Sequence, residues 1–293
     1  MARYRDIAEE LLARIAAGEL APGSGLPSVR AAGAEWGTTP ATIARAYGEL
    51  ARAGALDLAP RRAATVARDG AMHARRALHG ARALRLAGSD DPLLDRLAAT
   101  VDRVGAGGSF GGLTALWQGR ADAATLHLRH RDGDYNAPFA ARILEGRRPV
   151  LVHLWRREQG IIVPAGNPGG IEDVSDLTRC TVALRGTGTG TRVLLERLLR
   201  EAGADPAALH GPEVPTHLEA ALSVAAGLAD AAVGLRAAAE TVGLGFVPLA
   251  WEPFELALPE EALGAAADLL DAVGSAPAAP GFDLSGSGRV TRA

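Results

Sequence analysis

Lysine is absent from this sequence of 293 residues, and all 31 basic residues are arginine. The chain therefore cannot form the Schiff base that holds pyridoxal phosphate, and it has neither a Ser–Lys pair nor the lysine of a nucleotide P-loop. Cys180 is the one cysteine, which excludes an intrachain disulfide and a cysteine metal site. These absences exclude enzymes that depend on a lysine or on a metal bound by cysteines.

Long apolar runs and local catalytic motifs are also missing. The chain has no bilayer-spanning run, and its charged, amphipathic start has no signal-peptide core, so we expect a cytoplasmic protein that does not enter the membrane. The seven histidines form no HExxH or comparable pair, so no metal is expected, and His127 and His217 are interpreted as structural or cleft-lining. Without a GxSxG elbow at Ser89 or Ser109, we assign no catalytic residue and expect no enzyme.

Charge is distributed unevenly along the chain. Residues 1–85 carry 13 arginines against 8 acidic residues, a net charge of +5, whereas residues 86–293 carry a net charge of −8. A basic N-terminal segment on an acidic body favours a nucleic-acid contact at the N-terminus.

The most distinctive stretch is Leu184–Leu199, LRGTGTGTRVLLERLL, in which a Gly/Thr loop leads into an amphipathic helix. Glycines expose backbone N–H groups, and a helix N-terminus carries unpaired N–H groups and partial positive charge. Hydroxyls and one arginine add further donors; these candidate anion-binding residues are Thr187, Thr189, Thr191 and Arg192. The alternative, a Gly/Thr turn that only caps a helix, remains open at this point.

The N-terminal segment is predicted to contain three helices. Apolar residues recur with helical spacing from Tyr4 to Ile15, and Gly18 ends that helix. Ser28 is placed to cap a second helix that runs to Trp36. Thr39 and Pro40 form the cap and first position of a third helix, which Gly54 closes.

Two short strands, ALDL and ATVA, follow the third helix and predict a hairpin with a basic tip at Arg61 and Arg62. Helices followed by a hairpin in this order are typical of a winged helix-turn-helix, in which the third helix approaches base edges and the hairpin tip approaches phosphate or the minor groove. The outer face of the third helix includes Thr42 and Arg45. A small helical subdomain with solvated charges is the alternative.

Residues 4–66 resemble the DNA-binding domain of GntR-type bacterial regulators. The residues that carry the resemblance are Tyr4, Ile7, Ala8, Leu11, Ile15, Gly18, Leu20, Gly23, Leu26-Pro27-Ser28-Val29-Arg30, Thr42, Ala46, Tyr47, Leu50 and Gly54. The resemblance implies phosphate contacts from Ser28 and Arg30 and major-groove contacts from Thr39 and Thr42. The full set of predicted DNA-binding residues is Ser28, Arg30, Thr38, Thr39, Thr42, Arg45, Arg61 and Arg62. Pro40 and the glycine-free wing tip depart from the pattern of these regulators.

The rest of the chain alternates strands and helices, which predicts an α/β body with parallel strands. Ser89 follows an apolar strand and Ser109 precedes a helix, so hydroxyls at several helix starts could converge on one anion. Ligands in such folds lie at the carboxyl ends of strands. The segment RRPVLVHLWRREQGIIVPAGNP is predicted to form two strands that cross between two lobes.

Residues 83–290 resemble the periplasmic-binding-protein-like domain of molybdate- and tungstate-handling proteins. The motifs that carry the resemblance are Gly88-Ser89 with Asp91, GSFGGLTALWQGRADAATLHL, REQGIIVPAGNPGGIEDVSDL, GTGTRVLLERLL, THLEAALSVAAGLADAAVGL and PLAWEPFELALP. The resemblance implies a two-lobed type II binding fold whose oxyanion site is lined by Ser89, Ser109, Thr189, Thr191 and Arg192, with Tyr135 as a further candidate. Asp90 stands where relatives tend to have histidine, so either it points away from the ligand or the ligand is not a simple dianion.

We therefore expect a winged helix-turn-helix in residues 1–68, a linker in 69–82 and a two-lobed α/β ligand-binding domain in 83–293, with its second lobe near 160–245. The leading hypothesis is a homodimeric transcription regulator that binds double-stranded operator DNA and senses molybdate, tungstate or a similar small oxyanion, without a cofactor. The alternatives are a molybdenum-cofactor-related accessory protein or enzyme that binds a pterin or organic phosphate, and a cytoplasmic oxyanion-binding protein that does not bind DNA. An aromatic content of 4% argues against a pterin cleft.

Overall fold

The computed structural model describes residues 3–60, 62–68, 70–79, 84–105 and 107–293. The chain divides into two compact units. The N-terminal unit comprises Met1–Arg85, Ala99–Asp102 and Glu261–Leu269, and the C-terminal unit comprises Leu86–Ala98, Arg103–Glu260 and Leu270–Ala293. Among the described residues, no helix has both the length and the apolar character that crossing a bilayer requires.

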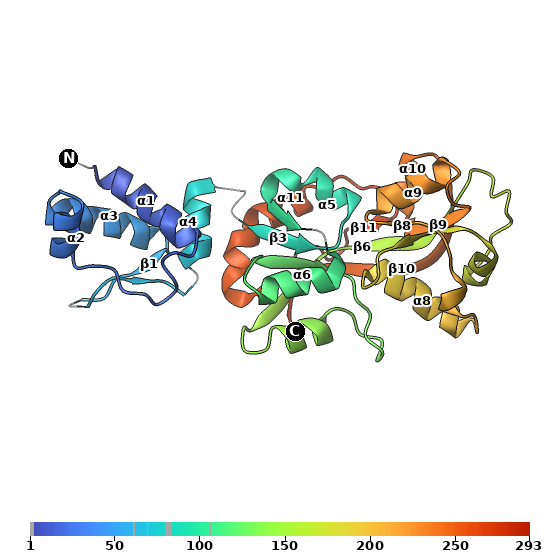
Figure 1. Cartoon of the computed structure of the whole chain (residues 1–293), viewed down its shortest axis with the longest axis horizontal. Helices are drawn as coiled ribbons and strands as arrows, with labels where there is room; N and C mark the ends of the chain where they lie inside the picture. Colours follow the sequence, from blue (N-terminus) through green and yellow to red (C-terminus); the bar gives the residue numbers. More distant parts are fainter. Residues whose placement is uncertain (1–2, 61, 69, 80–83, 106) are drawn as a thin grey trace. The chain divides into compact units, whose positions relative to one another are not determined.

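The N-terminal unit has the predicted element order. Its elements are α1 (Tyr4–Ala16), α2 (Val29–Glu35), α3 (Pro40–Arg52), β1 (Leu56–Asp57), β2 (Thr65–Val66) and α4 (Gly70–His79) (Figure 1). Ser28 caps α2 by accepting a hydrogen bond from the Ala31 N–H, and Thr39 caps α3 in the same way through the Thr42 N–H. The core is formed by fully buried side chains of the first and third helices, Ile7, Ile15, Ile43 and Leu50.

The C-terminal unit is built on one mixed sheet. Its strands are β3 (Arg85–Gly88), β4 (Asp102–Gly105), β5 (Ala123–Leu126), β6 (Pro149–Val163), β7 (Val182–Arg185), β8 (Glu213–Val214), β9 (Ala231–Leu235), β10 (Gly245–Pro259), β11 (Phe282–Asp283) and β12 (Val290–Arg292). The strand order is β4-β3-β5-β10-β6-β9-β7-β8, with β11 and β12 paired to β6. Strand β3 is parallel to β5, and β7 is parallel to β8 and β9, so each end of the sheet has its own parallel set.

These two parallel sets are the lobes of the C-terminal unit, and the antiparallel pair β6–β10 joins them. Figure 1 shows β6 and β10 running from the first lobe, which carries α6, into the second, which carries α8 and α9. The helices of this unit are α5 (Pro92–Arg96), α6 (Gly108–Trp117), α7 (Ala137–Ile143), α8 (Gly190–Glu201), α9 (His217–Ala225) and α10 (Arg236–Thr241), with 3₁₀ turns at Val174–Arg179 and Pro206–Ala208. The 3₁₀ turns Ala98–Thr100 and Glu260–Ala266 and helix α11 (Ala267–Gly274) each contain residues of both units. The fold is the predicted two-lobed α/β arrangement.

The predicted pair of strands between residues 147 and 168 is wrong, because β6 is one continuous strand of 15 residues. The polar run Arg157, Glu158 and Gln159 lies inside this strand. In the structure all three side chains are buried and have polar partners, so the strand continues through them. Beyond the run, Ile161 and Ile162 pack into two different apolar clusters on opposite faces of the sheet.

Helix α6 packs tightly on β3 at two glycines. A Cβ atom added to Gly112 would lie 2.6 Å from the Gly88 Cα, whereas one added to neighbouring Gly111 would meet no heavy atom within 4 Å. Gly88 itself has a φ of +117°, which a side chain rarely tolerates. The sequence therefore needs glycine at position 112 for packing and at position 88 for its backbone angle.

We predict that Gly112→Ala destabilises the protein by about 1–3 kcal/mol through overpacking. Gly111→Ala is the matched control, because it adds the same methyl group to open space in the same helix and should stabilise by up to about 1 kcal/mol. Urea unfolding followed by tryptophan fluorescence measures both differences. Equal effects of the two substitutions would contradict this account of the α6–β3 contact.

Candidate functional site

An open pocket of about 310 Å³ lies between the two lobes of the C-terminal unit. The first lobe contributes the turn after β3 and the start of α6, and the second contributes the loop between β7 and α8. The residues that line it are Asp90, Gly107, Gly108, Arg185, Gly186, Thr187, Thr189, Glu213, Val214 and Pro215. Its location at the carboxyl ends of the parallel strands is the usual one for a ligand in an α/β fold.

The N-termini of α6 and α8 meet at this interlobe pocket. Thr189 caps α8, and its hydroxyl also donates to the Gly186 carbonyl at 2.8 Å. A Cβ atom at Gly108, the first residue of α6, would lie 3.1 Å from the Thr189 Cγ2 atom. The two helix starts therefore approach each other closely, and both direct unpaired N–H groups and partial positive charge at the same place.

Ser89 and Ser109 form a buried hydroxyl pair in the first lobe. Their Oγ atoms are 2.8 Å apart, and Ser109 Oγ also accepts a hydrogen bond from the His127 N–H at 3.1 Å. A bond between two hydroxyls uses only one of their two protons. Neither hydroxyl has a further acceptor among the described residues, so the pair retains one proton that it can donate to a ligand.

A buried polar cluster lies where β6 and β10 cross between the lobes. We call it the crossover cluster; its members are His127, Tyr135, Arg157, Gln159, Thr191 and Glu252. Glu252 accepts from Gln159 Nε2 at 2.8 Å and from the Tyr135 hydroxyl at 3.4 Å, and its carboxylate lies 3.3 Å from His127 Nδ1. Thr191 of the second lobe donates to Gln159 Oε1 at 3.1 Å. The cluster therefore links both lobes to the crossing strands.

Burial controls ionisation within the crossover cluster. Burial first, and the nearby Arg157 charge second, lower the pKa of His127 to about 4, against the opposing influence of Glu252. His127 is therefore neutral at pH 7. Burial and the Glu252 charge raise the pKa of Tyr135, so its hydroxyl keeps its proton. Glu252 is the carboxyl group of the cluster, and it accepts hydrogen bonds from Gln159 and Tyr135.

An ion pair between Asp90 and Arg185 connects the two lobes. Asp90 follows β3 in the first lobe, and its carboxylate accepts from Arg185 Nη2 at 2.6 Å and from the His217 backbone N–H at 2.9 Å. The exposed fractions of the Asp90 and Arg185 side chains are 14% and 3%. Burial alone would raise the pKa of Asp90, but its interactions with His217 and Arg185 hold that pKa well below the ordinary value. Asp90 therefore points to the second lobe, and its charge is compensated there.

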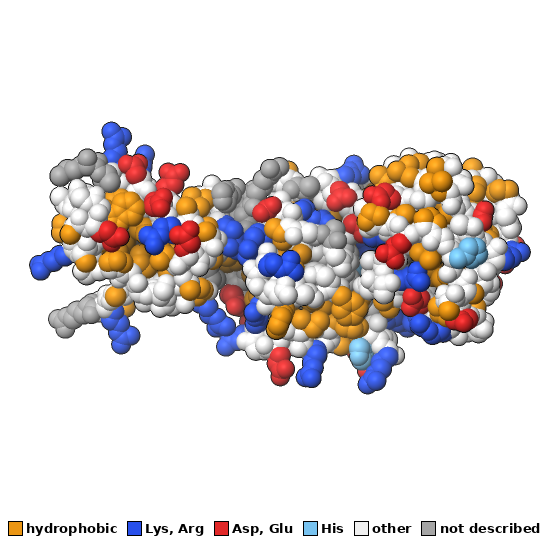
Figure 2. Space-filling view, in the orientation of Figure 1, with side chains coloured by type: hydrophobic (Ala, Val, Ile, Leu, Met, Phe, Trp, Pro, Cys, Tyr) orange, Lys and Arg blue, Asp and Glu red, His pale blue; other side chains and the backbone are white. Residues whose placement is uncertain are grey.

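Four of the predicted DNA-binding residues lie at the starts of α2 and α3, namely Ser28, Arg30, Thr39 and Thr42. The hydroxyls of Thr39 and Thr42 are 2.9 Å apart, and Arg30 is exposed. Figure 2 shows basic side chains projecting separately from this unit, without merging into one continuous patch.

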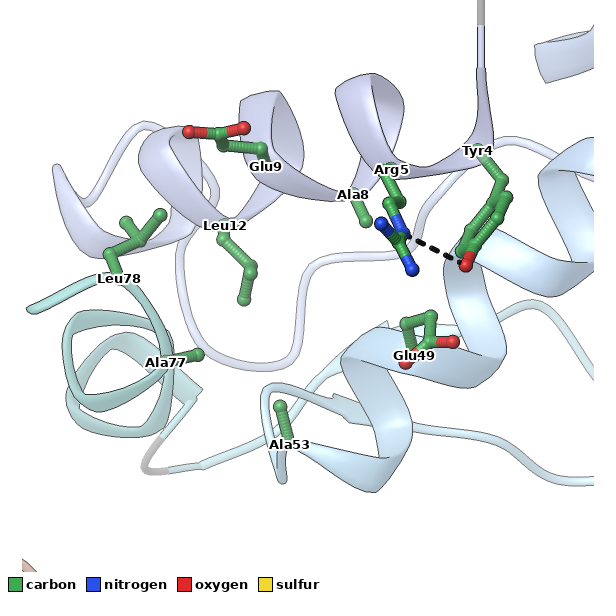
Figure 3. A pocket seen from close by; sticks show the side chains of 9 residues that line it. All are labelled: Tyr4, Arg5, Ala8, Glu9, Leu12, Glu49, Ala53, Ala77 and Leu78. Atoms are coloured by element: carbon green, nitrogen blue, oxygen red, sulfur yellow. Dashed lines mark hydrogen bonds between the residues drawn. The ribbon is translucent and has the colours of Figure 1, made fainter. Parts of the chain in front are cut away.

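A pocket of about 420 Å³ lies within the N-terminal unit, between α1, α3 and α4 (Figure 3). Figure 3 shows Tyr4 and Arg5 of α1 pointing toward the helix that carries Glu49. The Tyr4 hydroxyl accepts from Arg5 Nε at 3.1 Å and from Arg45 Nη2 at 3.2 Å, and the Arg45 guanidinium lies 3.8 Å from the Tyr4 ring centre. Contacts on one edge of this pocket therefore hold Arg45, a predicted DNA-binding residue of α3.

Comparison with protein families assigns both units. Residues 95–273 match the family model described as the PBP superfamily domain. The chain belongs to the PBP superfamily. Residues 3–66 match the family described as bacterial regulatory proteins of the gntR family. The predicted resemblances to a GntR-type domain and to a periplasmic-binding-protein-like domain are thereby confirmed, so this PBP-superfamily chain carries a GntR-type DNA-binding domain at its N-terminus.

One curated relative matches about half of the PBP-superfamily chain. The chain is 37% identical over 154 residues to the uncharacterized protein YvgK of Bacillus subtilis (strain 168), a match that covers 51% of this chain and 50% of YvgK. The chain thus spans about half the length of this curated relative.

Solved structures match the chain at low sequence identity and low TM-score. The CcmR regulatory domain of Synechocystis PCC6803, in complex with 2-PG, has a TM-score of 0.46 at 13% identity, covering 66% of this chain and 95% of that chain. A cysteine-to-serine mutant of OxyR from Corynebacterium glutamicum, with H2O2 bound, has a TM-score of 0.46 at 14% identity, covering 92% of this chain and 94% of that chain.

The structure brings most of the predicted anion-binding residues of the PBP-superfamily domain to the interlobe region. Ser89 and Ser109 touch each other, whereas Thr187 and Thr189 line the open pocket. The remaining hydroxyls, of Thr191 and Tyr135, belong to the crossover cluster and donate to Gln159 and Glu252.

Arg192 is directed elsewhere, because its Nε donates to Glu196 Oε1 at 2.7 Å along α8. The structure gives no contact between Arg192 and the serine pair among the described residues. Within the DNA-binding set, Ser28 and Thr39 act as helix caps, Thr38 and Thr42 are half-buried and Arg62 is exposed. Arg61 lies outside the described residues.

Sequence reasoning missed the buried charges of the site, namely Arg157, Arg185 and Glu252 with the amide of Gln159. The signal was present in the polar run Arg157–Gln159, because charged residues inside an otherwise apolar strand must be paired once they are buried. In this PBP-superfamily chain, the buried charged side chains and the hydroxyl groups together form the site.

We predict that Asp90→Asn destabilises the protein by about 3 kcal/mol at pH 7, because it leaves the buried Arg185 without its counter-ion. Asp90 has a lowered pKa in the folded state, so its contribution is complete above the unfolded pKa of about 4 and is lost as the pH falls below it. Urea unfolding at pH 7 and at pH 3.5 measures the difference, which should shrink at the lower pH. Asp132→Asn, in a loop position with a 67% exposed side chain, is the control. Equal stability of wild type and Asp90→Asn at pH 7 would refute the interlobe ion pair.

Proposed function

We propose that this chain is a ligand-responsive transcription regulator whose C-terminal cleft binds a small oxyanion, with molybdate or tungstate as the preferred ligands. Its GntR-type domain binds operator DNA, and homodimers read paired half-sites in the usual manner of helix-turn-helix proteins. The combination of a DNA-binding domain with a PBP-superfamily domain in one chain supports the regulatory role.

One observation carries the ligand class, which is the meeting of two helix N-termini beside the Ser89–Ser109 hydroxyl pair. The N-termini of α6 and α8 supply partial positive charge, and the serines supply a neutral donor. Asp90 does not oppose an anion here, because Arg185 and the His217 N–H compensate its charge.

Lobe closure provides the response in this proposal. A ligand that contacts both lobes favours the closed arrangement, and β6 and β10 are the two long strands that must bend when the lobes move. Coupling of this kind changes affinity at the second site by about 1–3 kcal/mol. Ligand binding in the C-terminal unit would then shift operator affinity at α3.

We predict that millimolar sodium molybdate or tungstate raises the melting temperature of the full chain by several degrees, because a ligand at 100 times its Kd adds about 2.7 kcal/mol of stability. Ser89→Ala combined with Ser109→Ala should abolish most of the shift, and sodium chloride at equal ionic strength controls for salt. The oxyanion assignment fails if no tetrahedral oxyanion at this concentration shifts the transition.

We predict that Arg62→Ala weakens binding to DNA from the gene's own upstream region and lowers the salt dependence of binding by about one counter-ion. Arg14→Ala, on α1 beside Glu19, is the matched control and should bind like the wild type. Mobility-shift assays with and without molybdate test both parts of the proposal. If the wild type shifts no upstream fragment, the chain is an oxyanion-binding protein without a DNA function.

A further inference from the structure

The central arginine of the crossover cluster is Arg157, in the middle of β6. Its side chain is fully buried. The Nη1 atom donates to the Asp91 carboxylate at 2.9 Å and to the Asp90 carbonyl at 3.1 Å. These two partners hold one corner of the guanidinium against the turn that directly follows Ser89.

The other edge of the Arg157 guanidinium has no partner. Within the described ranges, neither Nε nor Nη2 has a hydrogen bond. These two N–H groups point in the same direction in the plane of the group, and together they form the fork that binds two oxygens of one carboxylate or phosphate-like group. Because buried donors are normally paired, a buried guanidinium whose whole fork is unpaired indicates a binding partner outside the chain.

Polar residues of both lobes lie near Arg157. Across the sheet Arg157 is in register with Glu252, and Gln159 lies two residues further along β6 and holds Thr191 of the second lobe. The Arg157 charge contributes to lowering the pKa of both His127 and His217, which follow β5 and begin α9. The guanidinium carbon also lies 4.3 Å from the Phe254 ring centre, so the aromatic ring covers one face of the group.

Other arginines of the C-terminal unit are less suited to hold an anion. Glu196 neutralises Arg192 at 2.7 Å. Arg185 uses Nη2 to donate to Asp90 and to the Pro215 carbonyl, and Nη2 belongs to both two-donor edges of the guanidinium, so neither edge is free. Among these three, Arg157 alone has a two-donor edge that is both buried and without a partner in the described chain, and Asp91 offsets its charge at Nη1.

We propose that the Nε–Nη2 edge of Arg157 binds the ligand's anionic group, taking two oxygens of a tetrahedral oxyanion or of a carboxylate. This inference rests on the proposed ligand-binding function of the cleft. It identifies the Arg157 guanidinium as the group that recognises the negative charge of the ligand. Asp91 acts as a positioning residue that fixes the guanidinium through Nη1. The hydroxyl proton that the Ser89–Ser109 pair retains binds a further oxygen of the same group.

The test compares Arg157→Lys with Arg156→Lys in the full chain by calorimetric titration. Lysine at position 157 keeps the positive charge and can still pair with Asp91, but it has no fork. Arg156 is the neighbouring, exposed residue of β6 and makes a matched control. Sodium molybdate and sodium tungstate are the tetrahedral probes, and sodium acetate is the carboxylate probe. For the probe that binds the wild type, we expect Arg157→Lys to raise the dissociation constant by about 10- to 100-fold. Arg156→Lys should leave that dissociation constant within about twofold of the wild-type value.

A spectroscopic readout separates binding from a structural role. In protein labelled with [¹⁵N]arginine, the Nε–H signal absent from Arg157→Lys belongs to Arg157, and saturating probe should shift it strongly. If Arg157→Lys does not fold, the neutral double variant Asp91→Asn/Arg157→Gln removes the same fork. Its spectrum should lack the same Nε–H signal, and its affinity for the probe should fall by the same factor.

Two outcomes overturn the inference while leaving the oxyanion function intact. One is wild-type affinity in Arg157→Lys together with an unmoved Nε–H signal. The other is loss of binding in Arg192→Ala with full binding in Arg157→Lys, which would place the anion at the start of α8. A wild type that binds none of the three probes contradicts the proposed oxyanion function itself, and the inference with it.

Discussion

The burial of charge between two lobes is the constraint on which the C-terminal unit depends. Arg157 and Asp91 are both fully buried and 2.9 Å apart, and Glu252 lies across the sheet with 1% of its surface exposed. A buried charge without a partner costs several kcal/mol, so these residues must be held in fixed positions. Both crossing strands and the turn after β3 supply the partners. The need to pair these buried charges therefore fixes the position of the first lobe on the crossing strands.

Glycine allows the lobes to close around these charges. A Cβ atom at Gly190 would lie 2.3 Å from the His127 Cε1 atom and 2.6 Å from the His127 carbonyl oxygen. Gly190 begins α8 in the second lobe, whereas His127 follows β5 in the first, so the absence of a side chain permits the contact. The Gly/Thr loop therefore has two functions in this account, exposure of N–H groups to an anion and close approach of the lobes.

The sequence predicted those features that depend on local interactions. Ser28 and Thr39 cap α2 and α3 as expected, since capping joins residues three apart and needs no tertiary context. The orientation of Arg192 could not be predicted with the same security, because Glu196 stands four residues from both Arg192 and Arg200 and binds both. The continuity of β6 and the unpaired edge of Arg157 depend on residues nearly seventy positions away in sequence, which no local pattern encodes.

The central claim is that an anion is held in the interlobe cleft by the fork of a buried arginine beside two serine hydroxyls. Tungsten has a strong anomalous X-ray signal, so diffraction from crystals of the full chain grown with tungstate locates the ion directly. The account predicts one dominant anomalous peak whose ion has oxygens within hydrogen-bonding distance of Arg157 Nε and Nη2 and of the Ser89–Ser109 pair. A dominant peak beside Arg192 or on the protein surface, or no peak in the cleft, would contradict it.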